Sequence, residues 1–352
     1  MGVFSGAIVA VSDQQPAPAT LVYLMHPPAH FAQRQYLPPD VLRLVLDAGS
    51  DDVLVALMLQ LGNVGAVHQS RVGHHDEAAK VVSPHELVDY GVLQKVREHI
   101  KDEYGAKFSL EVLVKLFEFV VSPADRIVTG AVYTPKDIRR TILQRTLGDK
   151  SKKELSSIRI ADISCGCGGF LMDAALLVHQ KTGKAYAEIF RDNIFGVDIQ
   201  DYAIERTKVL LSLLALSEGE DEDFGFNLLC RDTLDYTCKN WDARYTGFDV
   251  VVGNPPYVCS RNLSEDTHAK LSGYEVCSSG HPDLCIPFFQ IAIEMLNDEG
   301  RLGYITMNTF LRSVNGRAIR KYFSSNRFLI CIVDFRGYQV FDSKILTHVC
   351  FI

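Results

Sequence analysis

Four consecutive residues, Asn254, Pro255, Pro256 and Tyr257, combine an amide, carbonyl acceptors and an aromatic ring directly after the apolar run 248–252. Proline fixes φ at about −65° and has no N–H, so two successive prolines make a stiff loop whose carbonyls remain available. The Asn254 side chain adds an oxygen acceptor, and the Tyr257 ring can stack on a planar group. This combination suits holding a planar group through its exocyclic amine, although a rigid turn with a surface tyrosine would contain the same residues.

A glycine-rich turn follows a second apolar run, 158–163, and contains Gly166, Gly168 and Gly169. Glycines allow unusual φ values and a close approach of the backbone to a ligand. The pattern is not the G-x-G-x-x-G fingerprint of dinucleotide-binding proteins. Asp162 beside the turn would repel a pyrophosphate but suits a cationic, amino-acid-like ligand. We therefore expect a sulfonium or ammonium cofactor rather than NAD.

Two further acidic residues follow successive apolar runs. Asp198 comes after 194–197, where an acid commonly holds a ribose diol. Asp232 comes after 226–230 and could accept a hydrogen bond from an adenine amino group. Each acid alone could be a helix cap or a solvated loop residue. Together with Asp162, they favour a cofactor that carries a nucleoside.

The elements that must position these residues alternate from about residue 126 onward. The predicted strands are 158–163, 194–197, 226–230, 248–252, 302–307, 328–333 and 345–352. The predicted helices between them are 170–180, 202–216, 286–297 and 315–324. Such alternation implies an α/β fold with a mostly parallel sheet covered by helices on both faces. We expect seven strands, of which the last two form a closing antiparallel hairpin.

The composition is that of a globular enzyme, with 47% hydrophobic and 22% charged residues among 352. Residues 1–125 mix proline-rich stretches with helical patterns, and we expect a mainly helical or irregular module of open role there. The start of the chain is a poor signal peptide, and the run 53–61 is too short to span a bilayer. We therefore expect a cytoplasmic protein without a membrane partner.

Charge is unevenly distributed along the chain despite a net charge of −7. Basic residues gather in 126–159 and 301–344, whereas acidic residues concentrate in 188–223. This asymmetry permits a basic face on an acidic protein, although solvated helix faces explain it equally well.

Metal binding and thiol catalysis find no support in the sequence. The nine cysteines follow no zinc spacing, and we expect reduced thiols and no metal. Cys165 and Cys167 are interpreted as small residues in a crowded turn, and His74 and His75 as loop residues.

Together these motifs resemble the S-adenosylmethionine-dependent N6-adenine DNA methyltransferases in which the cofactor motif precedes the catalytic one. Their first motif is approximately D/E-P-x-C-G-x-G-G-F-L, and this chain departs from it at Ile163, where proline is usual. Tyr133-Thr134-Pro135 is similar to an upstream motif that contacts the cofactor. Leu284 and Phe288 resemble part of a downstream motif near the cofactor. The resemblance covers roughly residues 126–352.

The resemblance implies a Rossmann-like methyltransferase domain at 126–352 that binds S-adenosyl-L-methionine. It implies the following cofactor-binding residues: Tyr133, Thr134, Asp162, Cys165, Gly166, Gly168, Phe170, Asp198, Ile199, Asp232 and Asn254. It implies the following catalytic residues: Asn254, Pro255, Pro256 and Tyr257. Asn254 and the Pro255 carbonyl would hold both amino hydrogens of adenine, and Tyr257 would stack on a base flipped out of the duplex.

The expected partner is double-stranded DNA, in a restriction-modification or phage-defence system. Family members carry a target-recognition region or borrow one from a partner subunit, and we recognise no such domain in this chain. The polar stretch 258–281 is a candidate DNA-contacting loop or simply a mobile one.

Other functions share the same tetrapeptide. It occurs in enzymes that methylate the N5 amide of protein glutamine and in relatives that act on guanine N2 of RNA. Tyr133-Thr134-Pro135 and the form of the glycine turn favour DNA adenine. A different class is a non-catalytic DNA-binding scaffold on the same fold, against which the intact Asp162, Asp198 and Asp232 argue.

Overall fold

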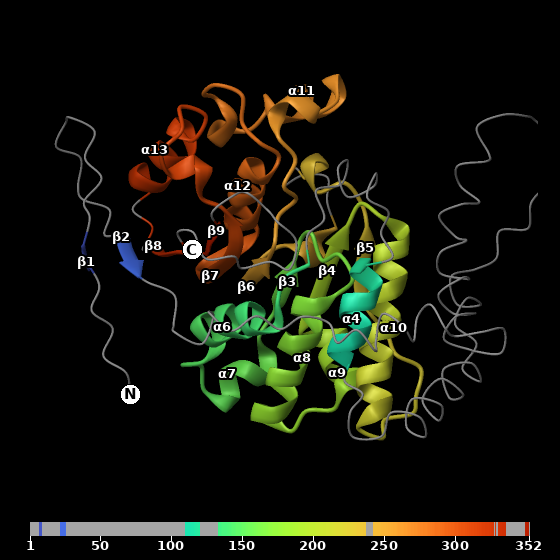
Figure 1. The fold of residues 1–352 in the computed structure, drawn as a ribbon. Helices are drawn as coiled ribbons and strands as arrows, with labels where there is room; N and C mark the ends of the chain where they lie inside the picture. The colour runs from blue at the N-terminus through green and yellow to red at the C-terminus, as the bar shows by residue number, and fades with distance from the viewer. Residues whose placement is uncertain are drawn as a thin grey trace, which may run out of the picture.

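The structure is a computed structural model that describes residues 7–8, 22–25, 110–119, 133–236, 242–326, 328, 330–335 and 349–351. Its strands form one nine-stranded sheet in the order β1-β2-β8-β9-β7-β6-β3-β4-β5 (Figure 1). The strands are β1 Ala7–Ile8, β2 Val22–Met25, β3 Ile160–Asp162, β4 Ile194–Asp198, β5 Asn227–Cys230, β6 Phe248–Gly253, β7 Leu296–Met307, β8 Ile330–Asp334 and β9 Val349–Phe351.

The strand order reverses beside β3. This strand pairs in parallel with β4 on one side and with β6 on the other, and β5 and β7 continue the parallel sheet outward. Only β1 and β9 pair antiparallel to their neighbours. Ligands of open α/β sheets bind beyond the carboxyl ends of the strands where the order reverses. The topology therefore directs a ligand to the ends of β3, β4 and β6.

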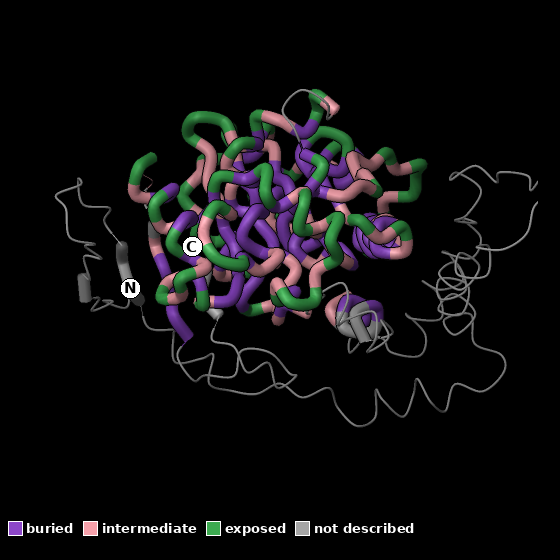
Figure 2. Tube along the Cα trace, turned by 90° about the horizontal axis from the view of Figure 1, so that it is seen from above, coloured by how far each residue is buried: buried purple, intermediate pink, exposed green. Residues whose placement is uncertain are grey.

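Helices cover both faces of the sheet. They are α4 Leu110–Phe119, α6 Lys136–Leu147, α7 Lys152–Ser157, α8 Gly169–Thr182, α9 Tyr186–Asp192, α10 Asp201–Ser217, α11 Glu265–Leu271, α12 Cys285–Met295 and α13 Arg317–Ser325. Helices α4, α6, α8, α9 and α10 pack in one hydrophobic cluster, and α12 and α13 in another. Figure 2 shows the buried chain gathered in the interior of the molecule.

Alternating residues of the central strands separate the two clusters. Val250 and Val252 belong to the first cluster, whereas Val251 between them belongs to the second. Ile160 and Ala161 divide in the same way. Successive side chains of a strand point to opposite faces, so an uninterrupted apolar run is buried on both sides. This explains why the central strands contain few polar residues before their ends.

Local sequence signals fix the elements around β3. Ser151 and Glu154 form a capping box at the start of α7, which precedes β3. Gly168, the N-cap of α8, has a φ of 83°, a conformation that suits glycine, and an added Cβ would lie 2.7 Å from a side-chain carbon of Thr207. The turn between β3 and α8 is therefore held tight by a residue without a side chain.

The seven predicted strands are all present, but the number seven is wrong because β1 and β2 extend the sheet beyond β8. The antiparallel pairing of the last two strands is confirmed. The strand predicted at 302–307 begins at Leu296, and residues 297–300 interrupt its pairing with β6 at a register shift. The stretch 258–281 is not an irregular loop, since it contains α11 and two short 3₁₀ helices, Ser260–Asn262 and Glu275–Cys277.

The mainly helical character expected for residues 1–125 is not confirmed. The described part of this region contains two strands and one helix, α4. The predicted boundary near residue 125 stays a prediction, and His74 and His75 lie outside the described residues. Throughout the described ranges, each helix is too short or too polar to cross a membrane.

Candidate active site

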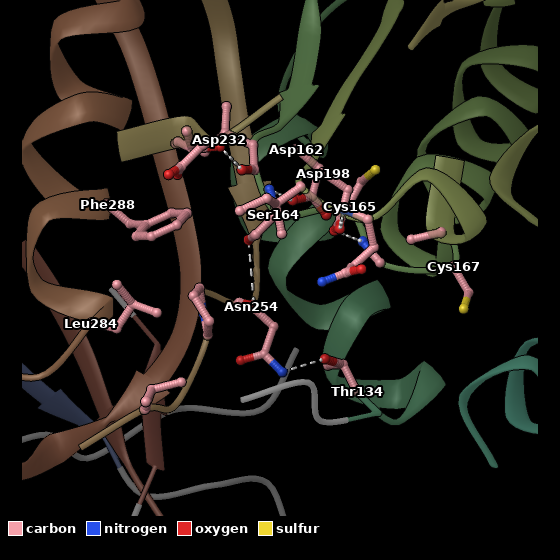
Figure 3. Close-up of a pocket in the computed structure, with 18 of the residues that line it drawn as sticks. Thr134, Asp162, Ser164, Cys165, Cys167, Asp198, Asp232, Asn254, Leu284 and Phe288 are labelled. Atoms are coloured by element: carbon pink, nitrogen blue, oxygen red, sulfur yellow. Dashed lines mark hydrogen bonds between the residues drawn. The ribbon is translucent and has the colours of Figure 1, made fainter. Parts of the chain in front are cut away.

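A cavity of about 380 Å³ opens at the carboxyl ends of β3, β4, β5 and β6. Its floor is the turn between β3 and α8, and Leu284 and Phe288 of the α12 region line the side opposite that turn (Figure 3). Asp162, Asp198 and Asp232 gather at one end of the view, and Asn254 lies nearer to Thr134. The three strand-end acids and the Asn254 loop therefore share one pocket, as the sequence predicts.

Asp162 is a buried carboxylate at the centre of this pocket, with 2% of its surface exposed. Its Oδ1 accepts one hydrogen bond, from the Ser164 N–H at 3.0 Å. Burial, together with the nearby charge of Asp198, raises its pKa from 3.8 to about 8. The next strand approaches closely, since a Cβ on Gly253 would lie 2.6 Å from Asp162 Oδ1. Among the described residues no cation pairs with this carboxylate, so the site favours a positively charged ligand.

Asp198 is held in a fixed orientation by backbone donors. Its Oδ2 accepts from Gly166 N–H at 2.8 Å, and its Oδ1 accepts from Gln200 N–H at 2.9 Å. Burial raises its pKa above the ordinary value. The adjacent Ile199 lines the cavity with 57% of its surface exposed, which is unusual for an isoleucine. A carboxylate with remaining lone pairs beside an exposed apolar side chain suits a ribose next to a flat base.

Asp232 carries a partner that the sequence did not predict. Lys270 of α11 lies 2.8 Å from its Oδ2 and also 2.8 Å from Asp235 Oδ1. The other oxygen, Oδ1, accepts from Leu234 N–H at 2.9 Å. Hydrogen bonds to the two carboxylates raise the pKa of Lys270. Helix α11 is thereby fastened across the end of the pocket where Asp232 lies.

Asn254 projects from the loop after β6, and its amide is oriented by Thr134. Nδ2 donates to Thr134 Oγ1 at 3.0 Å, which places Oδ1 on the opposite side of the amide. The backbone carbonyl of Asn254 accepts from Ser164 Oγ at 3.4 Å. Both contacts cross between segments that are distant in sequence, so the loop is fixed to the glycine turn and to the 133–135 segment.

Most predicted site residues line the cavity, but three do not. Among the predicted cofactor residues only Gly168 is absent from the lining of the cavity. It lies in the tight turn that precedes α8. Pro255 is buried, and Tyr257 is half-buried and packs against both hydrophobic clusters. Asn254 and Pro256 remain as the lining residues of the tetrapeptide.

The cysteines of the turn are buried structural residues. Cys165 and Cys167 expose 6% and 3% of their surfaces, and burial raises the pKa of the Cys165 thiol well above its ordinary value. A thiol in this state is a poor nucleophile. In the parts of the chain that the structure covers, no three His, Cys, Asp or Glu side chains are grouped so that they could hold a metal ion.

Sequence reasoning missed a buried network beside the pocket. Arg139, which the sequence placed within a basic stretch, is 1% exposed and contacts Glu111 of α4 and Asp173 of α8. Val114 of α4 also lines the cavity. No periodicity or motif connects residues so far apart in the chain.

The sheet order, the acids at successive strand ends and the amide loop define the class of Rossmann-like α/β methyltransferases. The solved structure of the type IIL restriction-modification enzyme MmeI in complex with DNA has the same fold, with a TM-score of 0.55 and 16% identity over 70% of this chain and 40% of that one. This likeness concerns the fold alone.

Sequence comparisons show which proteins the chain is similar to. The family model of the Eco57I restriction-modification methylase matches residues 192–341. The type II restriction enzyme and methyltransferase RM.Eco57I of Escherichia coli is 27% identical over 274 residues, which cover 64% of this chain and 27% of that protein. The adenine-specific methyltransferase PglX of Streptomyces coelicolor is 26% identical over 273 residues, covering 62% of this chain and 22% of that protein.

Over the residues that these comparisons cover, the chain is therefore similar to methyltransferases of restriction-modification systems. It spans about a quarter of the length of these two relatives.

Proposed function

We propose that this chain is the catalytic part of a DNA methyltransferase that transfers a methyl group from S-adenosyl-L-methionine to N6 of adenine. The observation that carries the proposal is the Asn254 side-chain amide, which Thr134 orients beside the pocket that contains the buried carboxylate of Asp162. The name of the relative PglX supports adenine, and the DNA complex of MmeI supports a DNA substrate. Recognition of a target sequence is proposed to come from a target-recognition region or a partner subunit.

The residues of the pocket fit S-adenosylmethionine on chemical grounds. Asp162 is a buried carboxylate that would gain a cationic partner from the methionine part of the cofactor. Asp198 would accept from the ribose hydroxyls, and Ile199 would cover a face of the adenine. Asp232 would accept from the cofactor's amino group beside its contact with Lys270. When bound, the cofactor supplies a methyl group on a positively charged sulfur.

The proposed mechanism is direct transfer assisted by oriented acceptors. The N6 lone pair of adenine is delocalised into the ring, so the nitrogen is a poor nucleophile. Asn254 Oδ1 and the Pro255 carbonyl would accept its two hydrogens, which favours a pyramidal nitrogen with its lone pair available. Thr134 keeps Oδ1 in place by accepting from Nδ2. After transfer, the nitrogen loses one proton to solvent, and no covalent enzyme intermediate forms.

Access to N6 requires the base to leave the duplex. Unstacking costs a few kcal/mol, part of which a stacking side chain can offset. Tyr257 is proposed for this role, and its packing against both hydrophobic clusters would hold the ring in one orientation. A fixed ring loses little conformational entropy when a base stacks on it.

The proposed activity predicts N6-methyladenine in DNA. The full-length protein, with any partner subunit, would be incubated with S-adenosylmethionine and mixed-sequence duplex DNA that lacks methylated adenine. Nuclease digestion and mass spectrometry should then detect N6-methyladenine and no other methylated base. Methyl groups found instead on protein glutamine or on guanine of RNA would overturn the proposal, as would cofactor binding too weak to measure.

An exposed basic surface formed by α13 and the segment before it gives a second prediction. Arg312, Arg317 and Lys321 are exposed, and their side chains form no hydrogen bond or ion pair with the rest of the described chain. They follow the carboxyl end of β7 in the chain, and the pocket opens at this end of the parallel strands. The N–H of His281 donates a hydrogen bond to Asn315 Oδ1 at 3.1 Å in the same region. We propose that this surface contacts DNA phosphates.

Replacing Arg317 and Lys321 together with alanine should weaken DNA binding and reduce the slope of log affinity against log salt by about 2, one unit for each lost phosphate contact. Fluorescence anisotropy at several salt concentrations measures both quantities. The matched control is Lys152→Ala with Lys153→Ala on α7, two exposed lysines at the opposite edge of the sheet. Equal effects of the two pairs would show that only net charge matters.

A further inference from the structure

A buried guanidinium connects three segments beside the pocket. Arg139 Nη2 donates to Glu111 Oε2 at 2.6 Å, and its Nε donates to Asp173 Oδ2 at 2.7 Å. Its Nη1 donates to the Thr134 carbonyl at 2.6 Å. The first residue of α8, Gly169, permits this packing, since a Cβ there would lie 3.3 Å from the guanidinium carbon. All three nitrogens of Arg139 thus have an acceptor on a different segment.

Glu111 also reaches the segment that lines the pocket. The Tyr133 hydroxyl donates to Glu111 Oε1, and the Tyr133 ring lies 5.9 Å from the guanidinium carbon of Arg139. Tyr133 and Thr134 both line the cavity. The Glu111 carboxylate of α4 therefore restrains two successive pocket residues. It contacts Tyr133 directly, and it contacts Thr134 indirectly, by way of Arg139.

The network is too well paired to be an incidental surface contact. The side chains of Arg139 and Asp173 are each 2% exposed, and that of Glu111 is 11% exposed. Charges buried this deeply are costly unless each has partners. The same pairing makes the arrangement rigid, because Arg139 cannot turn without leaving a buried carboxylate alone.

The network ends on the catalytic amide. Arg139 fixes the carbonyl of Thr134, and the hydroxyl of the same residue accepts from Asn254 Nδ2 at 3.0 Å. We propose that Glu111 and Arg139 are positioning residues for methyl transfer, which hold Thr134 so that Asn254 Oδ1 faces the amine to be methylated. Glu111 would then act in the reaction although it does not line the pocket. This inference rests on the proposed function for its kinetic consequences.

A double-mutant cycle tests whether Glu111 acts through Thr134. Glu111→Ala and Thr134→Val should each lower kcat about tenfold, the effect of losing one net hydrogen bond. In the Thr134→Val background, Glu111→Ala should have little further effect on kcat. Thr134→Ser, which keeps the hydroxyl, should restore most of the activity. Equal fold losses in both backgrounds would overturn the proposal, because a general loss of stability acts independently of Thr134.

A matched control removes an ion pair elsewhere. Asp149→Ala breaks the bidentate contact with Arg301, at 2.6 and 2.8 Å, without touching the pocket. It should leave kcat unchanged. A loss in kcat comparable to that of Glu111→Ala would show that the assay reports stability and not positioning.

A readout without methyl transfer separates this inference from the proposed function. With ¹⁵N-labelled asparagine, the side-chain amide signal of Asn254 can be identified by its loss in Asn254→Asp. Glu111→Ala should shift this signal in the free protein, whereas Asp149→Ala should not. An unshifted signal would exclude the proposed positioning role of Glu111, even if the protein methylates DNA. A shifted signal in a protein that methylates no substrate would instead contradict only the proposed function.

Discussion

Asn254→Ala is expected to lower kcat for methyl transfer at least about 10²-fold, with a much smaller change in cofactor affinity. Removing one preorganised polar group that acts on the reacting centre typically has an effect of this size. The side chain is oriented by Thr134 before any ligand binds, so its contribution comes without reorganisation in the reaction. Single-turnover methylation and calorimetric titration of the cofactor measure the two quantities separately.

Asn254→Asp is the informative control for this prediction. The carboxylate keeps an oxygen acceptor towards the pocket, and the Thr134 hydroxyl can donate to its other oxygen. Aspartate should therefore retain more activity than alanine. If alanine at this position leaves kcat within the experimental error of the unaltered protein, the proposed acceptor role of Asn254 is excluded.

Asp162→Asn is expected to change stability and cofactor binding in opposite directions. The folded-state pKa of about 8 lies above the ordinary value of 3.8, so the folded protein holds a proton that the unfolded chain releases between these pH values. The contribution of Asp162 to stability is then fully present below pH 3.8 and is lost as the pH rises to about 8. Asparagine removes this loss and keeps the acceptor for the Ser164 N–H. At pH 8 and without cofactor, the variant should therefore be more stable than the unaltered protein by a few kcal/mol, because one pKa unit corresponds to about 1.4 kcal/mol. Thermal unfolding across this pH range measures the effect.

The same substitution should weaken cofactor binding. A cationic ligand favours the ionised form of Asp162, so binding releases a proton while the pH lies below the pKa of this carboxyl group. Affinity of the unaltered protein should rise between about pH 6 and 7.5, below the titration of the cofactor's own amine. The asparagine variant should bind more weakly and lose most of this dependence. A variant that binds the cofactor normally would place the cation elsewhere in the pocket.

The pocket could be predicted from sequence because its chemistry lies at strand ends. Asp162, Asp198 and Asn254 each follow an apolar run, and parallel strands bring such residues to one edge. The glycine turn added a second local signal, since Gly168 needs a positive φ. These features depend on short stretches of chain, which sequence patterns describe well.

The missed features depend on tertiary contacts. Helix α6 was not predicted, because its lysines and arginines were interpreted as a basic face, yet Arg139 is buried in a charge network. Arg159 of the same basic stretch lies over the rings of Phe195 and Phe248, at 4.7 and 4.9 Å from their centres. The role of a charged residue depends on partners that are distant in the sequence. The residues next to α4 and Lys270 in the chain do not indicate what these two contact. Strands as short as β1 and β2 carry no usable periodicity.

The position of α4 has a consequence for protein engineering. Val114 forms part of the pocket wall, and Glu111 is one of two carboxylates that neutralise Arg139. A fragment begun at residue 126 would lose both, leaving a buried cation with a single carboxylate partner and a cavity open on one side. A unit intended for transfer to another scaffold, or for fusion to a foreign recognition module, should therefore begin before residue 110.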